Sequence, residues 1–233
     1  MEASYVPENS SLVVIGNIEY GFTLEIIEKI FAGWKDNSRK IEEEAVDSAP
    51  GIYINKGNGM SSVLSIGFRS LGYDDHRRLA TEMMVRILGG GGLQSRIVNE
   101  IRVKRGLAYT VGGFASVYRK RGTLGFTVVC NKDKSIEAAK AMSNVLTEAR
   151  DVGFSDAEVE REKKVMETNL LLSVDNITEH LRYIGKCGTM NTNFFIENEI
   201  RAIKNIQKAD VNKAAKELLV ETNTDYKNMH SVV

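Results

Sequence analysis

The chain has 233 residues, of which 42% are hydrophobic and 27% are charged, a composition typical of a globular protein with its own core. Lysine plus arginine and aspartate plus glutamate number 31 each, so no net charge favours nucleic acid or an anionic membrane. No apolar stretch is long enough to span a membrane, and residues 1–22 lack a signal-peptide pattern. We therefore expect a soluble chain, cytoplasmic or, with an upstream signal, periplasmic or organellar.

The first 45 residues have the pattern of a small separate element. The apolar run at residues 12–15 predicts a buried strand that ends at Gly16. Residues 23–34 predict a helix with Thr23 as its N-cap, and the polar residues that follow have no periodic core signal. We therefore expect a strand–helix element with its linker at residues 1–45 and a main domain at residues 46–233.

The main domain begins with predicted strands. They are expected at residues 52–54 and 62–68, on either side of a turn at 56–59, and at residues 107–118 and 123–130, which form a hairpin. Between the two pairs lie two expected helices, residues 74–88 with Asp74 as the cap and residues 94–104.

After residue 130 the apolar spacing is helical. It predicts helices over about residues 136–149, 155–170, 175–187, 194–204 and 208–219, the second of them opened by a capping box of Ser155 and Glu158. Residues 226–233 are a candidate edge strand. Strands joined by hairpins and followed by a bank of helices predict an α+β fold, a two-layer α/β sandwich with a largely antiparallel sheet covered by helices.

Self-contained catalytic motifs are missing from the sequence. The histidines, His76, His180 and His230, form neither H-E-x-x-H nor H-x-x-E-H, so no metal site is expected in this chain. Cys130 and Cys187 have no C-x-x-C spacing and are read as buried free thiols, with a disulfide as the less supported alternative. No G-x-S-x-G nucleophile motif is present.

A glycine-rich loop, Gly89, Gly90, Gly91 and Gly92, is the most unusual local feature. A phosphate-binding loop normally follows a strand and opens a helix, whereas this run follows a predicted helix and lacks a subsequent Lys-Ser or Lys-Thr. A helix stop that permits close backbone packing is therefore favoured over phosphate or nucleotide binding.

Arg102 and Tyr109 are the candidate binding pair. Gly106 is expected to turn a short helix into a strand, which brings the two side chains to one corner. A guanidinium fork and a phenol hydroxyl suit a peptide carbonyl, a carboxylate or an oxyanion. From spacing alone, a solvated helix charge and a surface aromatic explain the pair better, because such pairs are common.

Residues 88–109 combine LGGGG at 88–92, Ser95-Arg96, a hydrophobic helix that ends in Ile101-Arg102, and RGLAY at 105–109. This combination resembles the second half of a metallopeptidase unit of the pitrilysin family, which includes insulin-degrading enzyme and mitochondrial processing peptidase. YVPEN at 5–9 with LVVIGN at 12–17, and FSDAEVEREK at 154–163, resemble further family segments. The resemblance covers nearly the whole chain and implies a LuxS/processing-peptidase-like metallohydrolase fold.

The resemblance implies a division of roles between two halves. A homologous zinc-bearing domain or subunit carries H-x-x-E-H, whose glutamate acts as general base, and a further glutamate ligand. The non-zinc half contributes an arginine and a tyrosine, which correspond to Arg102 and Tyr109, for backbone contact and oxyanion stabilisation. The expected partners are the zinc-bearing half and a peptide substrate, with a homo-oligomer as a further option, no nucleic acid and no membrane span.

This sequence departs from the family pattern because it has no H-x-x-E-H. The resemblance therefore implies the substrate-binding half of a zinc metallopeptidase, inactive alone, with no cofactor in this chain and zinc in a partner or upstream half. Residues 12–34 correspond to the closing strand and helix of the preceding domain in the family. The alternative is a non-catalytic scaffold or core-type subunit from the same family, against which the retention of Arg102 and Tyr109 argues mildly.

Overall fold

The computed structural model describes residues 5–35, 51, 53–55, 57–192 and 195–220. The chain forms two compact units: unit 1, residues 1–48 and 168–197, and unit 2, residues 49–167 and 198–233. Unit 2 contains the sheet, the glycine run and both candidate binding residues. The compact units do not test the domain boundary expected at residue 45, which stays a prediction.

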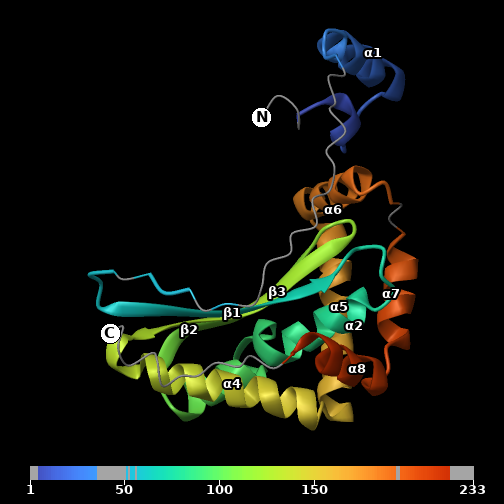
Figure 1. The fold of residues 1–233 in the computed structure, drawn as a ribbon. Helices are drawn as coiled ribbons and strands as arrows, with labels where there is room; N and C mark the ends of the chain where they lie inside the picture. Colours follow the sequence, from blue (N-terminus) through green and yellow to red (C-terminus); the bar gives the residue numbers. More distant parts are fainter. Residues whose placement is uncertain (1–4, 36–50, 52, 56, 193–194, 221–233) are drawn as a thin grey trace. The chain divides into compact units, whose positions relative to one another are not determined.

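Unit 2 is built on an antiparallel sheet. Its described strands are β1 (Ser61–Leu71), β2 (Ala108–Val117) and β3 (Arg121–Asn131), in the order β1-β3-β2 (Figure 1). The register aligns Ser61 with Asn131 and Leu71 with Arg121. The predicted hairpin is confirmed, and the Tyr118 N–H closes it by donating to the Arg121 carbonyl at 2.9 Å.

One face of the sheet forms the core of unit 2. Leu124, Phe126, Val128 and Cys130 of β3 are at most 5% exposed, as the two-residue period of a strand requires. The elements that cover this face lie on one side of the sheet (Figure 1): α2 (Arg78–Val85), the π-helical turn η2 (Arg86–Gly90), η3 (Gly92–Gln94), α3 (Arg96–Val98), the π-helical turn η4 (Asn99–Lys104), α4 (Ser135–Asp151) and α8 (Lys208–Leu218). The predicted two-layer α+β sandwich is confirmed.

The apolar stripes predicted for the helices form the other half of this core. Buried members are Leu79, Met83, Met84, Ile87 and Leu88 of α2–η2, Ile97, Val98 and Ile101 of α3–η4, and Ala139, Met142, Val145, Leu146 and Ala149 of α4. Ile136, predicted in the same stripe, is half-buried. A short turn, η5 (Lys132–Lys134), leads from β3 into α4.

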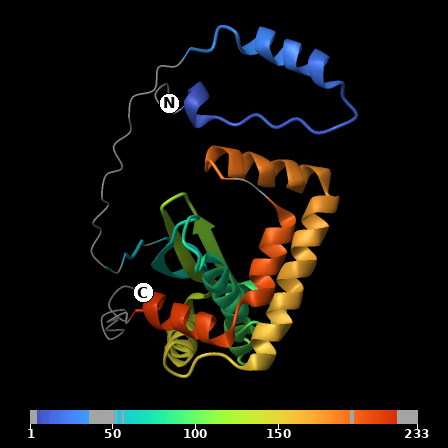
Figure 2. The same cartoon turned by 90° about the vertical axis from the view of Figure 1, so that its right-hand side faces the viewer.

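The long helix α5 (Asp156–Asp175) begins at the predicted capping box. The Ser155 N–H donates to Glu158 Oε2 at 2.8 Å, and the Glu158 N–H donates to Ser155 Oγ at 3.3 Å. Helix α7 (Ile196–Asn205) runs beside α5 (Figure 2), and Lys204 Nζ lies 2.9 Å from Glu167 Oε1. Thus α7 is fixed to α5 within unit 2.

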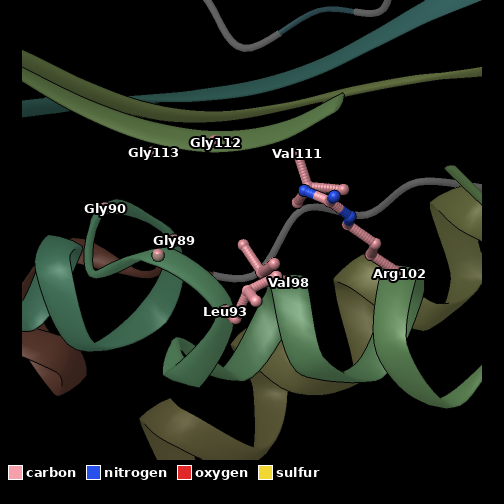
Figure 3. Close-up of a pocket in the computed structure, with 9 residues that line it drawn as sticks. Gly89, Gly90, Leu93, Val98, Arg102, Val111, Gly112 and Gly113 are labelled. Carbon is pink, nitrogen blue, oxygen red and sulfur yellow. The ribbon is translucent and has the colours of Figure 1, made fainter. Parts of the chain in front are cut away.

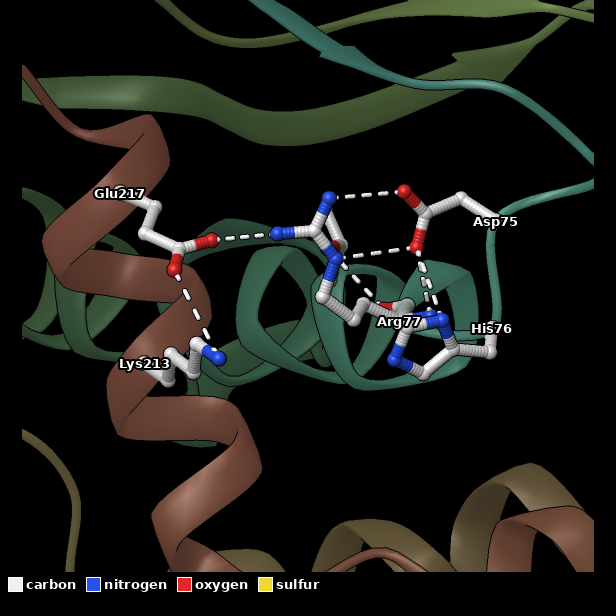
Figure 4. A network of polar contacts seen from close by, with 6 residues as sticks. Asp75, His76, Arg77, Lys213 and Glu217 are labelled. Carbon is white, nitrogen blue, oxygen red and sulfur yellow. Dashed lines mark hydrogen bonds and ion pairs between the residues drawn. The ribbon is translucent and has the colours of Figure 1, made fainter.

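The connection from β1 to α2 differs from the prediction. Helix α2 begins at Arg78, so Asp74 is not its cap. Instead, Asp75 accepts hydrogen bonds from the backbone and side chain of Arg77, at 2.7–3.0 Å, and Arg77 also binds Glu217 of α8 at 2.6 Å (Figure 4). The turn that Asp75 stabilises delays the start of the helix.

Two predicted strands are wrong in their described parts. Residues 12–15 and 53–54 are not strands, because neither segment pairs with a neighbouring strand in the described chain and a strand requires such a ladder. Tyr53 is 86% exposed and Ile54 is 47% exposed, so the second segment also buries no apolar face. Ile52, Lys56 and the candidate edge strand at residues 226–233 lie outside the described residues.

Unit 1 contains η1 (Pro7–Asn9), α1 (Tyr20–Phe31) and α6 (Ile177–Thr189). The prediction of Thr23 as N-cap of the first helix is wrong, because Glu19 accepts from the N–H groups of Gly21 and Phe22. The Thr23 hydroxyl donates to the Glu19 carbonyl at 2.7 Å. Among the described helices of the chain, none combines the length and apolar character needed to cross a bilayer.

Candidate functional site

Arg102 and Tyr109 come from two elements joined by a tight turn. Arg102 lies in the last turn of η4, and Tyr109 is the second residue of β2. Gly106 between them has φ of +59°, a left-handed conformation that strongly favours glycine. The Leu107 N–H donates to the Ile101 carbonyl at 2.9 Å, which closes the turn and sends the chain back along the helix end.

A β-bulge sets the position of Tyr109. Ala108 pairs with Cys130 and Thr110 pairs with Val129, so Tyr109 is the extra residue between two adjacent pairs. A bulge of this kind redirects a side chain and commonly occurs beside functional sites. Neither the bulge nor its location follows from the sequence, because RGLAY reads as the start of a regular strand.

The structure brings Arg102 and Tyr109 into direct contact. The Arg102 guanidinium carbon lies over the Tyr109 ring, 4.4 Å from its centroid. Tyr109 is 80% exposed, so the contact is an exposed cation–π interaction, worth about 0.5–1 kcal/mol. Its main consequence is geometric: the contact holds the guanidinium at the corner beside the ring.

Arg102 lines a cleft between β2 and the glycine run (Figure 3). The cleft has a volume of about 350 Å³, and the residues that line it are Gly89, Gly90, Gly92, Leu93, Val98, Arg102, Val111, Gly112 and Gly113. In the close-up, Arg102 rises from its helix toward Val111 of the strand. The lining consists of five glycines, three aliphatic residues and Arg102, which is its one charged residue.

The glycine run approaches β2 through its backbone. A Cβ on Gly89 would lie 2.9 Å from Phe126 Cδ1 and 3.0 Å from the Gly113 nitrogen, while one on Gly113 would lie 3.2 Å from the Gly89 carbonyl carbon. A Cβ at either position would be closer than ordinary van der Waals contact, so the neighbouring atoms would have to shift. The helix passes into η2 and ends inside the run, at Gly90, so close packing and helix termination, both predicted, occur together.

The charge of Arg102 is not neutralised by the described part of the chain. Within the described residues Arg102 contacts the Tyr109 ring, whereas Glu100 on the same helix binds Arg105 at 2.8 Å and Lys104 at 3.1 Å. The Arg105 hydrogen bond, followed by that of Lys104, lowers the pKa of Glu100, so this carboxylate is committed elsewhere. The corner therefore offers a cation to a ligand, and no side chain of the lining can act as nucleophile or base.

Two buried or half-buried ion pairs on either side of the glycine run were missed by the sequence reasoning. Arg86, just before the run, donates to Glu162, which is 3% exposed. Arg96, just after it, binds Glu158 through two hydrogen bonds of 2.7 and 2.8 Å. Glu158 and Glu162 are one turn apart on α5, so this helix anchors both ends of the run. The spacing of Glu158 and Glu162, four residues apart, could have indicated that both face the same side of the helix. The other charged residues around them, however, are typical of a solvent-exposed helix face.

The remaining candidates are not brought together. His76 has a 91% exposed side chain near Asp75, His180 lies in unit 1 on α6, and His230 lies outside the described residues. Among the described residues, no group of three histidines, cysteines, aspartates or glutamates could hold a metal ion. Cys130 and Cys187 are buried free thiols, as predicted, and burial raises the pKa of Cys130. The residues that the structure describes therefore do not fit a zinc site.

Comparison with known proteins agrees with this arrangement. Residues 1–166 match the family described as Peptidase M16 inactive domain. The chain belongs to this family. Membership confirms the resemblance to the non-zinc half of pitrilysin-type metallopeptidases.

Individual relatives of this M16 inactive domain are distant. A Rickettsia bellii protein named as an uncharacterized zinc protease is 26% identical over 222 residues, which cover 94% of this chain and 53% of the relative. This chain thus spans about half the length of that relative.

Solved structures share the fold at lower identity. A protease from Helicobacter pylori matches with a TM-score of 0.72 and 14% identity, over 88% of this chain and 51% of that one. A chain of Complex III2 from Candida albicans, with Inz-5 bound, matches with a TM-score of 0.69 and 14% identity, over 93% and 56%. At this identity the two likenesses show the fold alone.

Proposed function

We propose that this M16 inactive domain is the substrate-binding half of a zinc metallopeptidase, and that Arg102 and Tyr109 contact the peptide. One observation carries the proposal: Arg102 stands in a glycine-walled cleft against Tyr109, without a carboxylate partner in the described chain. A structural arginine is normally paired, as Arg86 and Arg96 are here. An available guanidinium beside a phenol hydroxyl is suited to a peptide carbonyl or to the oxyanion that forms during hydrolysis.

The zinc and the general base belong to a homologous half, supplied by another chain or by another part of a longer protein. Support comes from the family's description as an inactive domain and from the length of the relative, about twice that of the matched segment. Within this proposal, the present chain binds and orients the peptide and supplies a positive charge and a hydroxyl donor opposite the metal.

The proposal is tested by cleavage of a fluorogenic peptide after mixing this chain with the zinc-bearing half. Arg102→Ala should lower kcat/KM by about 100-fold, because it removes the cation that faces developing charge. Tyr109→Phe keeps the ring over the guanidinium and removes the hydroxyl alone, so it separates the donor from the packing contact. A decrease for this variant assigns the hydroxyl a role in binding or catalysis.

Arg105→Ala is the matched control. Arg105 lies just beyond the same helix end and is bound to Glu100, so its loss should change the rate by no more than about 2-fold, as for an exposed ion pair. Equal effects of Arg102→Ala and Arg105→Ala would contradict the proposed role. A mixture in which the present chain stimulates no cleavage would favour the scaffold alternative instead.

A further inference from the structure

We infer that the cleft beside Arg102 binds the C-terminal end of a peptide, with the α-carboxylate on the guanidinium and an aliphatic side chain against the cleft wall. The inference rests on the binding role given to Arg102 in the proposed function, and it specifies the ligand. It concerns this chain by itself and requires no metal.

The hydrogen-bonding capacity of the guanidinium is the first argument. Arg102 contacts the Tyr109 ring, 4.4 Å from the guanidinium carbon to the ring centroid, and this contact leaves its N–H donors for a ligand. A carboxylate can accept two parallel hydrogen bonds from a guanidinium, a geometry that a single carbonyl oxygen cannot provide. Arg102 is therefore suited to a planar anion.

The charge balance of the cleft is the second argument. Arg102 is the one charged residue in the lining, and the other lining side chains are aliphatic. A carboxylate brings one negative charge, which this cation neutralises. A phosphate brings up to two, and the η2 turn meets the cleft with its C-terminal end, at Gly90, where the helix dipole is negative. The site therefore favours a monoanion over a phosphate.

The backbone of the walls is the third argument. The last carbonyl groups of a helix have no partner within the helix and accept hydrogen bonds from other donors. The end of η2 lines the same cleft as Arg102, at Gly89 and Gly90, so the backbone of a helix end and a cation border one cavity. A peptide terminus carries N–H donors next to its carboxylate, whereas phosphate in its dianionic form carries none.

The aliphatic part of the lining gives the side-chain preference. Val98 lies one turn before Arg102, so both project from the same side of the helix, and Val111 lies across from them on β2 (Figure 3). Leu93 completes this wall and is 57% exposed, so a ligand can cover it. We therefore expect leucine or valine as the last residue of the peptide to bind better than aspartate or glycine.

The test measures binding to the full chain alone. Fluorescein-labelled peptides that end in Ala-Leu, with either a free carboxylate or a C-terminal amide, are titrated and followed by fluorescence anisotropy. The acid should bind at least about 10-fold more tightly than the amide, since a charge-assisted pair with Arg102 is lost in the amide. A peptide that ends in Ala-Asp should bind more weakly than the Ala-Leu acid.

Variants connect the difference to Arg102. Arg102→Ala should bring the affinity for the acid down to that for the amide, Arg102→Lys should restore part of the difference, and Arg105→Ala should preserve it. Circular dichroism spectra identical to wild type show that each variant is folded. Loss of the difference in Arg105→Ala as well would overturn the assignment to Arg102.

The other outcomes are also decisive. Equal binding of acid and amide to the wild-type chain, competition by inorganic phosphate as strong as by the acid peptide, or no saturable binding up to about 1 mM would overturn the inference. If cleavage with the zinc-bearing half depends on Arg102 but the acid and amide peptides bind equally, the proposed function holds and the carboxylate inference fails. If the acid peptide binds selectively but no cleavage occurs, the carboxylate inference holds and the proposed function fails.

Discussion

Gly89 and Gly113 show what the tertiary contact demands of single residues. A Cβ at either position would lie 2.9–3.0 Å from Phe126 Cδ1 and 3.0–3.2 Å from the backbone of the other glycine, closer than ordinary van der Waals contact. We predict that Gly89→Ala lowers the free energy of unfolding by about 1–3 kcal/mol, the usual cost of overpacking a core, and disturbs the cleft. Urea denaturation of the purified chain measures this change.

Gly112→Ala is the control for this substitution, in the residue next to Gly113. A Cβ on Gly112 meets nothing within 4 Å, so the stability should stay the same or rise by a few tenths of a kcal/mol through the reduced entropy of the unfolded chain. If the two variants are equally stable, the close approach of the glycine run to β2 is not a constraint on the fold.

The Arg96–Glu158 pair gives the fold a dependence on pH. Burial raises the pKa of Glu158, but hydrogen bonds from Arg96 and from the Ser155 N–H and hydroxyl outweigh it and lower the pKa from 4.5 to about 2. Because the folded pKa is below the unfolded one, the stabilisation is complete above pH 4.5 and is lost as pH falls toward 2. Asp75, whose pKa the Arg77 side chain lowers from 3.8 to about 2, acts in the same direction.

We predict that Glu158→Gln flattens the decline in stability between pH 5 and pH 2. Glutamine keeps an acceptor for Ser155 but cannot titrate. The side chains of Arg96 and Glu158 are about one-fifth exposed, so solvent screening limits the difference from wild type at neutral pH to about 1–2 kcal/mol. Denaturant titrations at several pH values measure how the free energy of unfolding changes with pH. Glu160→Gln is the control, because the exposed carboxylate of Glu160 forms an ion pair on the same helix. An unchanged slope in Glu158→Gln would show that Arg96 does not hold this carboxylate.

At the scale of elements, regular periodicity was the reliable part of the sequence. The alternation in β3 and the apolar stripe of α4 are each local patterns repeated several times, so chance cannot imitate them. The capping box of α5 was equally readable, because its two members lie three residues apart. These elements define the two layers of unit 2.

The errors have physical causes of two kinds. Helix starts moved by three or four residues, because several neighbouring side chains compete for the free N–H groups. At α1, Glu19 accepts from these groups in place of Thr23. Residues 12–15 have the composition of a strand, but a strand exists only if another one pairs with it. Composition cannot show whether that partner belongs to the same chain.

The candidate site was predictable in its residue types and not in its geometry. Spacing indicated that Arg102 and Tyr109 share a corner, and the positive φ of Gly106 provides it. The bulge that redirects Tyr109 depends on the register with β3, and the anchors of the glycine run join residues 62 and 76 positions apart. Such contacts leave no periodic trace in the sequence.

At the scale of the whole molecule, unit 1 has the surface of an interface. Helix α1 has no buried residue, and its exposed apolar side chains include Phe22, at 63%, and Ile30, at 68%. In the preceding extended segment, Leu12 and Val14 are exposed while Val13 and Ile15 are half-buried, the alternation of a strand. Large apolar side chains exposed on a helix and on the segment before it are candidates for contact with a partner.

We predict that this surface contacts the zinc-bearing half in the assembled peptidase. An extended segment without a pairing strand in the described chain can add to the edge of another sheet, with its exposed side chains and α1 covered in the process. Combined Val14→Glu and Ile30→Glu substitutions should therefore weaken copurification with the zinc-bearing half by at least about 10-fold, the cost of placing charges in an apolar interface. Glu25→Gln, a change of an exposed polar residue on the same helix, should have no effect.

Light scattering after size-exclusion chromatography separates the possible partners. If the chain alone is a stable dimer that the double variant converts to a monomer, a second copy covers this surface instead of the zinc-bearing half. If the double variant changes neither the copurification with the zinc-bearing half nor the oligomeric state of the chain alone, the apolar surface of α1 is not an interface. Because Arg102 lies in unit 2, the double variant should still bind the carboxylate peptide, so loss of both properties would indicate unfolding rather than a lost contact.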